Sequence, residues 1–230
     1  MKKKISKRYK KIIEKNKDLN KVQLVDEAIK KVKENCNVKF DESIDVSFNL
    51  NLKSKKEEVN LRTSVNLPNG NGKKIKVAVL CEESKASEAK KGGADFFNSE
   101  SLIKDINDGK IQFDKLVATP SMMPKMGKLG KILGPKGLMP NPKLGTVTNN
   151  IESIVKALKT GQIEIKSDKD GNVGASIGKK SFSDEKIKQN YEAILNSIIK
   201  EKPNNIKGEF ILSAFLTSTM GISYKLKLGK

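Results

Sequence analysis

Apolar residues recur with a period of two in the first part of the chain. Between Val38 and Leu52 the even-numbered positions are apolar except for Glu42, and the odd-numbered positions are polar. The segment Val59–Leu67 alternates in the same way. A period of two is typical of a strand with one buried face, so both segments are expected to be strands. The pattern breaks in the turn-forming sequence Pro68–Gly72, PNGNG, where we place the first domain boundary.

A helix and a basic arm precede these strands. Between Val22 and Asn35 the apolar residues at positions 25, 28, 29 and 32 recur at helical spacing, which predicts an amphipathic helix. Residues 1–21 contain ten Lys and Arg against two acidic residues, and their apolar residues are too few to anchor a long helix tightly. Such a basic arm often becomes ordered only on its partner.

The pattern changes after the boundary. Ile75–Cys81 and Lys115–Pro120 are short, nearly continuous apolar runs, with helical candidates at Ala86–Lys91 and Leu102–Ile106 between them. Strands that are buried on both faces and alternate with helices are typical of a parallel, helix-covered sheet. Residues 68–160 are therefore expected to form an α/β domain.

A helix from Ile151 to Leu158 is expected to close this α/β domain. Thr148 or Asn149 suits its N-cap, and Gly161 suits its C-terminal stop. Beyond that glycine, Gln162–Ile177 reads QIEIK, SDKDG and NVGASI, which predicts two strands joined as a hairpin.

The remainder of the chain predicts one helix and two strands. The apolar face of the helix comprises Ile187, Tyr191, Ile194, Leu195, Ile198 and Ile199, and the strands are Glu209–Thr217 and Ile222–Leu228. The simplest fold joins residues 1–67 and 161–230 in one split α+β domain, into which the α/β domain is inserted through two chain crossings. Such a double linkage is expected to act as a hinge.

Charge narrows the choice of partner. The 230 residues include 46 Lys and Arg against 27 Asp and Glu, and no His, so the formal net charge is +19. An excess of this size attracts a polyanion, and binding to phosphates should weaken steeply with salt. A solvated, Lys-rich surface explains some of these lysines but not so large an excess. No predicted helix combines a strongly cationic face with large apolar residues, so nucleic acid is favoured over a membrane.

Other residue types exclude several classes of site. Cys36 and Cys81 are far apart, with no His nearby, which predicts neither a zinc site nor a disulfide framework and suits a reducing cytoplasm. The basic amino terminus lacks the apolar core of a signal peptide, and no stretch approaches the roughly 20 apolar residues of a membrane span. We expect a soluble, unexported protein without metal or cofactor.

Catalytic motifs are absent from the sequence. Every Gly-Lys pair lacks the earlier glycine and the following Ser or Thr of a phosphate loop, and no GxGxxG fingerprint occurs. The commonest general base, His, is missing. No acidic residue lies between Asp114 and Glu152, so carboxylate catalysis is excluded from the most distinctive segment.

That segment, Gly127–Thr148, reads GKLGKILGPKGLMPNPKLGTVT. Its glycines and prolines prevent long regular structure, and apolar residues such as Leu129 and Leu133 can pin it to its own sheet. The lysines in and beside it, Lys125, Lys128, Lys131, Lys136 and Lys143, have no compensating acid in the segment. A positive platform for a nucleic-acid backbone and a packed surface loop with solvated lysines are about equally compatible with this pattern.

The same segment resembles the L-one family of bacterial large-subunit ribosomal proteins. The resemblance also includes KFDES at 39–43, GADFF at 93–97, GKKSF at 178–182 and STMG at 218–221, and it spans nearly the whole chain in order. It implies a split domain that binds large-subunit rRNA at the mobile stalk, and an inserted Rossmann-like domain that meets tRNA leaving the exit site. It further implies a ribosome-bound, non-catalytic protein that is monomeric when free and represses translation of its own messenger.

The family's RNA contacts, carried over by motif, fall on two short segments. They are Phe40, Asp41 and Ser43 in KFDES and Thr219, Met220 and Gly221 in STMG, with Lys39 as a phosphate partner. A hydroxyl such as Thr219 can bond a ribose 2′-OH, and Gly221 would let the RNA backbone approach closely. The lysines expected to meet tRNA or an RNA backbone are Lys125, Lys128, Lys131 and Lys136.

Alternatives remain at several of these positions. Phe40 shares the parity of Ile44 and Val46, so the pattern alone favours a core position unless the start of the strand is bulged or exposed. Met220 and Gly221 could simply form the turn between two strands. A free-standing RNA-binding regulator and an enzyme with a nucleotide site in the α/β domain are the rival functions.

Overall fold

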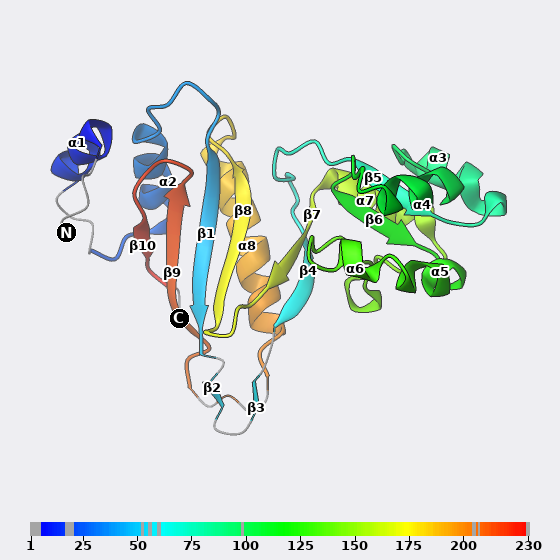
Figure 1. Cartoon of the computed structure of the whole chain (residues 1–230). Helices are drawn as coiled ribbons and strands as arrows, with labels where there is room; N and C mark the ends of the chain where they lie inside the picture. Colours follow the sequence, from blue (N-terminus) through cyan, green and yellow to red (C-terminus); the bar gives the residue numbers. More distant parts are fainter. Residues whose placement is uncertain are drawn as a thin grey trace. The chain divides into compact units, whose positions relative to one another are not determined.

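The chain folds into two compact units. Unit 1 comprises Met1–Gly72 and Ile163–Lys230, and unit 2 comprises Lys73–Gln162. The computed structural model (Figure 1) describes residues 6–16, 21–51, 53–54, 57–58, 61–97, 99–203, 206 and 208–228. Within these residues, no helix has the length and apolar character needed to cross a bilayer.

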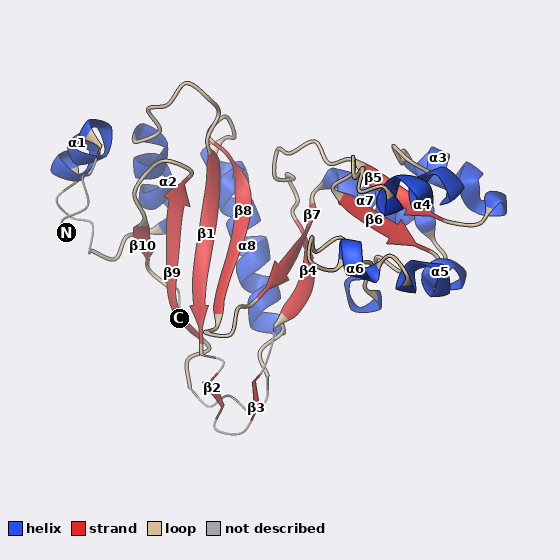
Figure 2. Ribbon diagram, in the orientation of Figure 1, coloured by secondary structure: helices blue, strands red, loops and turns tan. Residues whose placement is uncertain are grey.

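Unit 1 is built on a four-stranded antiparallel sheet in the order β10-β9-β1-β8 (Figure 2). The strands are β10 (Tyr224–Leu226), β9 (Ile211–Ser218), β1 (Ser43–Leu50) and β8 (Asn172–Lys179). Alternate residues of β1, such as Val46 and Phe48, are buried. They belong to one core with the apolar residues of α2 (Val25–Glu34) and α8 (Asp184–Lys200).

The long helix α8 begins at a side-chain cap. The hydroxyl of Ser183 accepts a hydrogen bond from the N–H of Lys186. Its buried stripe contains Ile187, Tyr191, Ile194 and Ile198, as the helical spacing predicts. The expectation for Ile199 was wrong: this side chain is 52 % exposed, because it lies one position beyond the stripe.

The first strand begins later than its alternation predicts. β1 starts at Ser43 rather than Val38, and residues 38–40 form a bend. A register shift between Ile44 and Asp45 marks a bulge at the start of the strand. After the short strands β2 (Lys53–Ser54) and β3 (Glu57–Glu58), β4 spans Arg62–Asn66. Val59, at the start of the second predicted strand, lies outside the described residues.

The predicted hairpin from Gln162 to Ile177 is confirmed only at its turn, where Ser167 and Val173 form an antiparallel bridge and the Asp168 N–H donates to the Asn172 carbonyl. β7 (Gln162–Lys166) pairs with β4, whereas β8 pairs with β1. Ser167 explains the choice of partner, because its N–H donates to the Leu61 carbonyl and its hydroxyl accepts from the Leu61 N–H. Two different sheets therefore share the turn that follows β7.

Unit 2 contains a parallel pair of strands, β5 (Val77–Leu80) and β6 (Lys115–Ala118). Parallel bridges at Phe96 and Val147 extend this pair on either side. One face packs against α4 (Ser99–Asn107), α5 (Met123–Gly127) and α6 (Gly130–Leu133); the other packs against α3 (Ala86–Gly92) and α7 (Ile151–Thr160). Three short 3-10 turns, η1 (Glu83–Lys85), η2 (Pro120–Met122) and η3 (Pro142–Leu144), complete the described elements of unit 2.

The predicted C-terminal end of α7 is confirmed, but the predicted N-cap is wrong. Gly161 ends the helix with φ 122°, a backbone angle suited to glycine. The N-cap is Asn150 rather than Thr148 or Asn149, and its side chain makes no capping bond. Instead, the Thr148 hydroxyl accepts a hydrogen bond from the Asn150 N–H and so shapes the turn before the helix.

The basic arm contains a packed helix. α1 spans Lys7–Lys15, with the Ser6 hydroxyl accepting a hydrogen bond from the Tyr9 N–H at its N-cap. Ile12 is only 3 % exposed and belongs to the unit 1 core. This buried residue, with partly buried Tyr9 and Ile13 beside it, packs α1 against the unit 1 core.

A polar network attaches the end of α1. Asn16 donates to the side-chain oxygen of Asn35 and accepts from the hydroxyl of Tyr224, which in turn accepts from Asn35. Burial raises the pKa of Tyr224 to about 12, so this hydroxyl keeps its proton at physiological pH.

Candidate nucleic-acid interface

The two predicted RNA-contact segments meet at one edge of unit 1. KFDES ends at the first residue of β1 and STMG begins at the last residue of β9, and these strands are antiparallel neighbours. The N–H of Thr219 donates to the Ser43 carbonyl over 3.0 Å, and the N–H of Ser43 donates to the Thr219 hydroxyl over 3.1 Å. Segments 176 residues apart are thereby joined into one surface, which we call the recognition surface (residues 39–43 and 218–221).

The Thr219 hydroxyl is partly committed within the protein. Besides accepting from the Ser43 N–H, it lies 3.3 Å from the Ser43 carbonyl, to which it can donate. A hydroxyl has one donor and two acceptor positions, so one acceptor position is left for an incoming 2′-OH. Thr219 is therefore suited to accept from RNA rather than to donate to it.

The peptide groups around Met220 are held between the side chains of Glu42 and Arg8. The Met220 N–H donates to Oε2 of Glu42 over 3.0 Å, and its carbonyl accepts from Nη2 of Arg8 over 2.8 Å. Glu42 is fully buried. We did not predict either residue. Glu42 could have been found from the sequence, because it is the one acidic residue among the apolar even-numbered positions from 38 to 52. Nothing in the basic arm distinguished Arg8 from its neighbours.

Packing inside the turn leaves no room for a side chain at Gly221 unless the Ser218 hydroxyl moves. A Cβ at this position would lie 2.4 Å from the hydroxyl oxygen of Ser218, which is itself buried. The backbone of Gly221 is not in the left-handed region. The missing side chain therefore leaves room for Ser218, and the added Cβ would point into the protein.

The GKKSF segment braces the other half of the recognition surface. Both carboxylate oxygens of Asp41 accept from Ser181, one from its N–H and one from its hydroxyl. Lys180 holds the same stretch, with its N–H bonded to the Glu42 carbonyl and its ammonium group bonded to the Cys36 carbonyl. With its carboxylate occupied in this way, Asp41 positions its neighbours.

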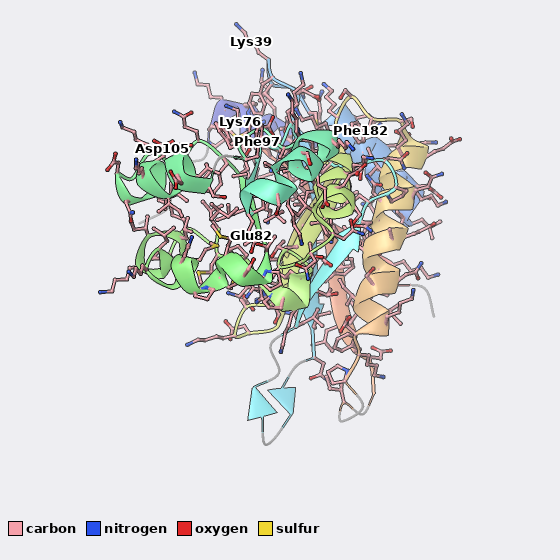
Figure 3. The ribbon with its side chains drawn as sticks, turned by 90° about the vertical axis from the view of Figure 1, so that its right-hand side faces the viewer. Lys39, Lys76, Glu82, Phe97, Asp105 and Phe182 are labelled. Carbon is pink, nitrogen blue, oxygen red and sulfur yellow. The ribbon has the colours of Figure 1, made fainter. Side chains whose placement is uncertain are left out.

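Large side chains project from this braced backbone. Phe40 is 52 % exposed and Met220 is 45 % exposed. The core alternative for Phe40 was wrong because β1 begins three residues later, so the parity of the strand does not apply to it. Lys39 is also exposed, and Figure 3 shows it projecting from the surface. Two exposed apolar side chains beside a cation suit a partner with flat bases, sugars and phosphates.

Burial alters the chemistry of one thiol near the recognition surface. Desolvation raises the pKa of Cys36, while the Ser218 hydroxyl acts in the opposite direction. The thiol is therefore neutral at physiological pH and unreactive as a nucleophile. Within the described residues, no group of three or more His, Cys, Asp or Glu side chains could hold a metal ion.

The predicted lysine platform belongs to unit 2. Its four cations, Lys125, Lys128, Lys131 and Lys136, are all exposed. Between them, Met126, Leu129 and Leu133 are buried in the unit 2 core, which fixes the short helices α5 and α6. The lysines therefore stand on a locally pinned segment, whereas the recognition surface is assembled from distant segments of unit 1.

Comparison with known proteins gives matches over most of the chain. The sequence model described as "Ribosomal protein L1p/L10e family" matches residues 32–222. The chain is 56 % identical over 226 residues to "Large ribosomal subunit protein uL1" of Pelagibacter ubique (strain HTCC1062), which covers 98 % of each chain. It is 48 % identical over 204 residues to proteins of the same name from Prochlorococcus marinus strains NATL1A and NATL2A, covering 89 % of this chain and 87 % of each relative.

Proposed function

This chain belongs to the ribosomal protein L1p/L10e family, and we propose that it is a constituent of the large ribosomal subunit whose unit 1 binds rRNA at the mobile stalk. In this proposal the rRNA-binding domain comprises residues 1–67 and 161–230, and residues 68–160 form an inserted Rossmann-like domain. The relatives bear the name of a structural protein of the ribosome, which indicates a role without catalysis.

One observation carries the proposal for unit 1. The reciprocal hydrogen bonds between Ser43 and Thr219 join two sequence motifs into a fixed surface from which Phe40 and Met220 project. A fixed surface with exposed apolar groups and a remaining hydroxyl acceptor suits folded RNA, which is recognised through shape, stacking and the 2′-OH. Such readout favours RNA over DNA.

We propose that unit 2 serves a second RNA. Its four exposed lysines are presented by a segment without acidic residues, which suits the phosphate backbone of exit-site tRNA during release of deacylated tRNA. The two crossings between the units would let unit 2 move while unit 1 stays on rRNA.

The recognition surface also supports a regulatory role when the protein is free and monomeric. A surface that reads RNA shape accepts any RNA that presents the same shape. A stalk-like fold in the protein's own messenger would therefore compete with rRNA for unit 1, and its occupation would repress translation.

The test is equilibrium binding of the whole chain to a large-subunit rRNA stalk fragment and to a scrambled RNA of equal length, at several salt concentrations. Specific recognition predicts tight binding to the stalk fragment that persists at salt concentrations where the scrambled complex dissociates. Equal affinity and equal salt dependence for both RNAs would reduce unit 1 to a cationic surface and refute the proposal.

A further inference from the structure

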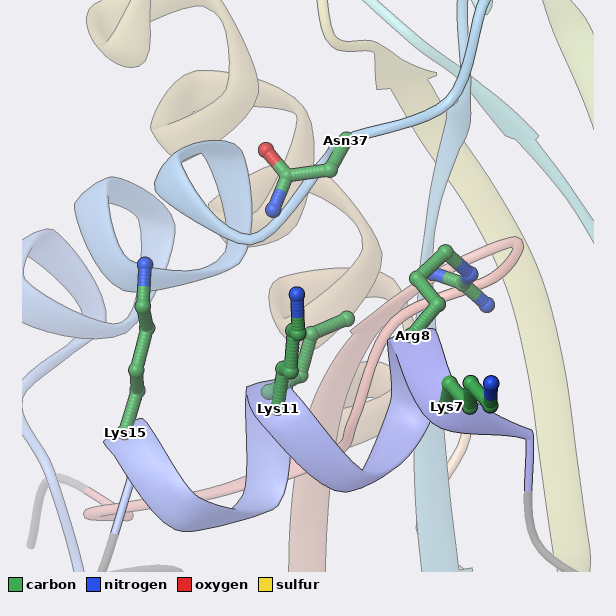
Figure 4. Close-up of a pocket in the computed structure, with 6 residues that line it drawn as sticks. Lys7, Arg8, Lys11, Lys15 and Asn37 are labelled. Atoms are coloured by element: carbon green, nitrogen blue, oxygen red, sulfur yellow. The ribbon is translucent and has the colours of Figure 1, made fainter.

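A pocket of about 390 Å³ lies along the basic helix α1. Four cations line it, together with Ile12 and with Asn37 from the segment after α2; the cations are Lys7, Arg8, Lys11 and Lys15. Figure 4 shows Lys11 and Lys15 rising from the helix toward the segment that carries Asn37. None of the described residues that line this pocket is acidic.

The spacing of the lysines is unfavourable for an isolated helix. Lys7, Lys11 and Lys15 are four residues apart, so they share one face of α1 and repel one another. The first turn of the helix has no acidic residue to offset this repulsion. Like charges at this spacing destabilise a helix. An anion in the pocket would remove this cost.

The helix that carries these lysines is held in place. Ile12 anchors its middle in the unit 1 core, and Asn16 attaches its end to Tyr224. The backbone positions of these lysines are therefore fixed before an anion binds. Binding then costs less conformational entropy.

We propose that this pocket binds consecutive phosphates of an RNA backbone and extends the recognition surface. The inference rests on the proposed rRNA binding by unit 1. Continuity supports it, because Arg8 lines the pocket and also donates to the Met220 carbonyl of the recognition surface. An RNA strand that crosses Met220 is thereby led to the lysines of α1.

Length favours a row of phosphates over a single free anion. Lys7 and Lys15 are eight residues apart, and at 1.5 Å per residue their Cα atoms are separated by about 12 Å along the helix. One phosphate group cannot contact both ends of such a row, whereas successive phosphates of one strand can. We call this row the phosphate pocket (Lys7, Lys11 and Lys15 with Arg8 and Asn37).

The test compares lysines inside and outside the pocket. The triple variant Lys7→Gln, Lys11→Gln, Lys15→Gln is titrated with the stalk fragment at several salt concentrations, beside Lys10→Gln. Lys10 is an exposed lysine of the same helix that does not line the pocket, so it controls for loss of charge. Thermal unfolding of each variant verifies that unit 1 remains folded.

Each lost phosphate contact should reduce the salt slope by about 0.7, which corresponds to about fivefold in affinity at 0.1 M salt. The triple variant is therefore expected to lose about 2 in slope and about 100-fold in affinity, with less than a twofold loss for Lys10→Gln. The preference for the stalk fragment over scrambled RNA should persist, because phosphate contacts carry no sequence information. An unchanged slope in the triple variant, or an equal effect per lysine at Lys10, would overturn the inference.

Two further results separate the possible failures. If the unmodified chain does not prefer the stalk fragment, the proposed function fails irrespective of the pocket; if the preference holds but the slope of the triple variant is unchanged, only the pocket fails. The last experiment is competition of inorganic phosphate with RNA at constant ionic strength. Displacement of RNA from the unmodified chain but not from the triple variant would identify a site for free phosphate and contradict the backbone assignment.

Discussion

The recognition surface of unit 1 and the lysine platform of unit 2 both present exposed side chains, but they are built differently. In unit 1, Ser43 and Thr219 bring distant segments together, and Glu42 and Arg8 hold the peptide groups of Met220. In unit 2, one continuous segment carries its lysines outward, and its own buried residues, such as Leu129 and Leu133, pin it to the core. The first surface depends on long-range geometry and the second on local packing.

Under the proposed function, this difference predicts two kinds of RNA binding. A surface assembled by hydrogen bonds with fixed directions can read shape, and a small displacement of its turn should affect the affinity strongly. A row of exposed lysines reads mainly charge, so each lysine should contribute a similar, salt-dependent amount. Substitutions at Gly221, at Lys128 with Lys131, and at Thr219 test this contrast, and a substitution at Tyr224 tests the stability of unit 1.

Gly221→Ala should give the largest effect. The new Cβ would meet the Ser218 hydroxyl at 2.4 Å and displace the turn, so we expect about 30-fold weaker binding to the stalk fragment, or about 2 kcal/mol. Isothermal titration measures the change. Gly127→Ala in unit 2 is the matched control, because a Cβ there meets nothing within 4 Å.

The double variant Gly221→Ala, Ser218→Ala tests whether the contact with the Ser218 hydroxyl causes the loss of affinity. Removal of the hydroxyl relieves the contact inside the turn, so most of the lost affinity should return. Persistence of the full loss in the double variant would mean that RNA itself needs the space at Gly221, as the sequence alone suggested.

Charge removal in unit 2 should affect the other RNA. Lys128→Gln with Lys131→Gln is expected to weaken tRNA binding about 25-fold at 0.1 M salt, about fivefold for each lost phosphate contact. Binding of the stalk fragment should change less than twofold. Gel-shift titrations with both RNAs measure these effects, and a large loss for the stalk fragment would show that the roles of the two units are divided incorrectly.

Thr219→Val should give an intermediate effect on unit 1. It removes the acceptor for the Ser43 N–H and the position left for a 2′-OH, so stalk affinity should fall about tenfold, or about 1.4 kcal/mol. Thr63→Val on β4 is the isosteric control, because its hydroxyl bonds Glu201 outside the recognition surface. An unchanged affinity in Thr219→Val would remove this hydroxyl from the site.

Tyr224→Phe should act mainly on stability. It breaks the network among Asn16, Asn35 and the tyrosine hydroxyl, which should lower the free energy of unfolding by about 1–2 kcal/mol at pH 8. Urea unfolding measures the difference between the unmodified chain and this variant.

The same substitution predicts a pH dependence. The folded pKa of Tyr224 is raised to about 12, above its ordinary value of 10.0. The stabilisation is therefore complete below pH 10 and is lost as pH rises toward 12. The stability difference between the two proteins should shrink by about 1 kcal/mol at pH 11. A difference that stays constant from pH 8 to pH 11 would contradict the buried, bonded hydroxyl.

Elements with long, regular patterns were predictable from the sequence. The alternation of β1 and the apolar stripe of α8 both appear in the structure, because each element buries one face against a single core. The apolar runs predicted for β5 and β6 also appear as strands, and both of their faces pack against a hydrophobic core. In these cases the burial of each residue follows from its own position in the element.

Features that depend on distant partners were not predictable. Nothing local shows that β7 pairs with β4 rather than along β8, since Ser167 bonds Leu61, which comes from the other chain segment of unit 1. The same reason explains why Glu42 and Arg8 were missed: their importance lies in their bonds to Met220. The unit 2 platform, in contrast, was visible as one run of glycine, proline and lysine.

Hydrogen exchange of the free protein tests most directly whether the recognition surface exists before RNA binds. The amides of Ser43, Thr219 and Met220 all donate hydrogen bonds within it. A surface assembled in advance predicts that all three amides are protected in the free chain and gain little protection with the stalk fragment. Rapid exchange in the free chain, with protection appearing only in the complex, would show that RNA assembles the surface and would contradict this account.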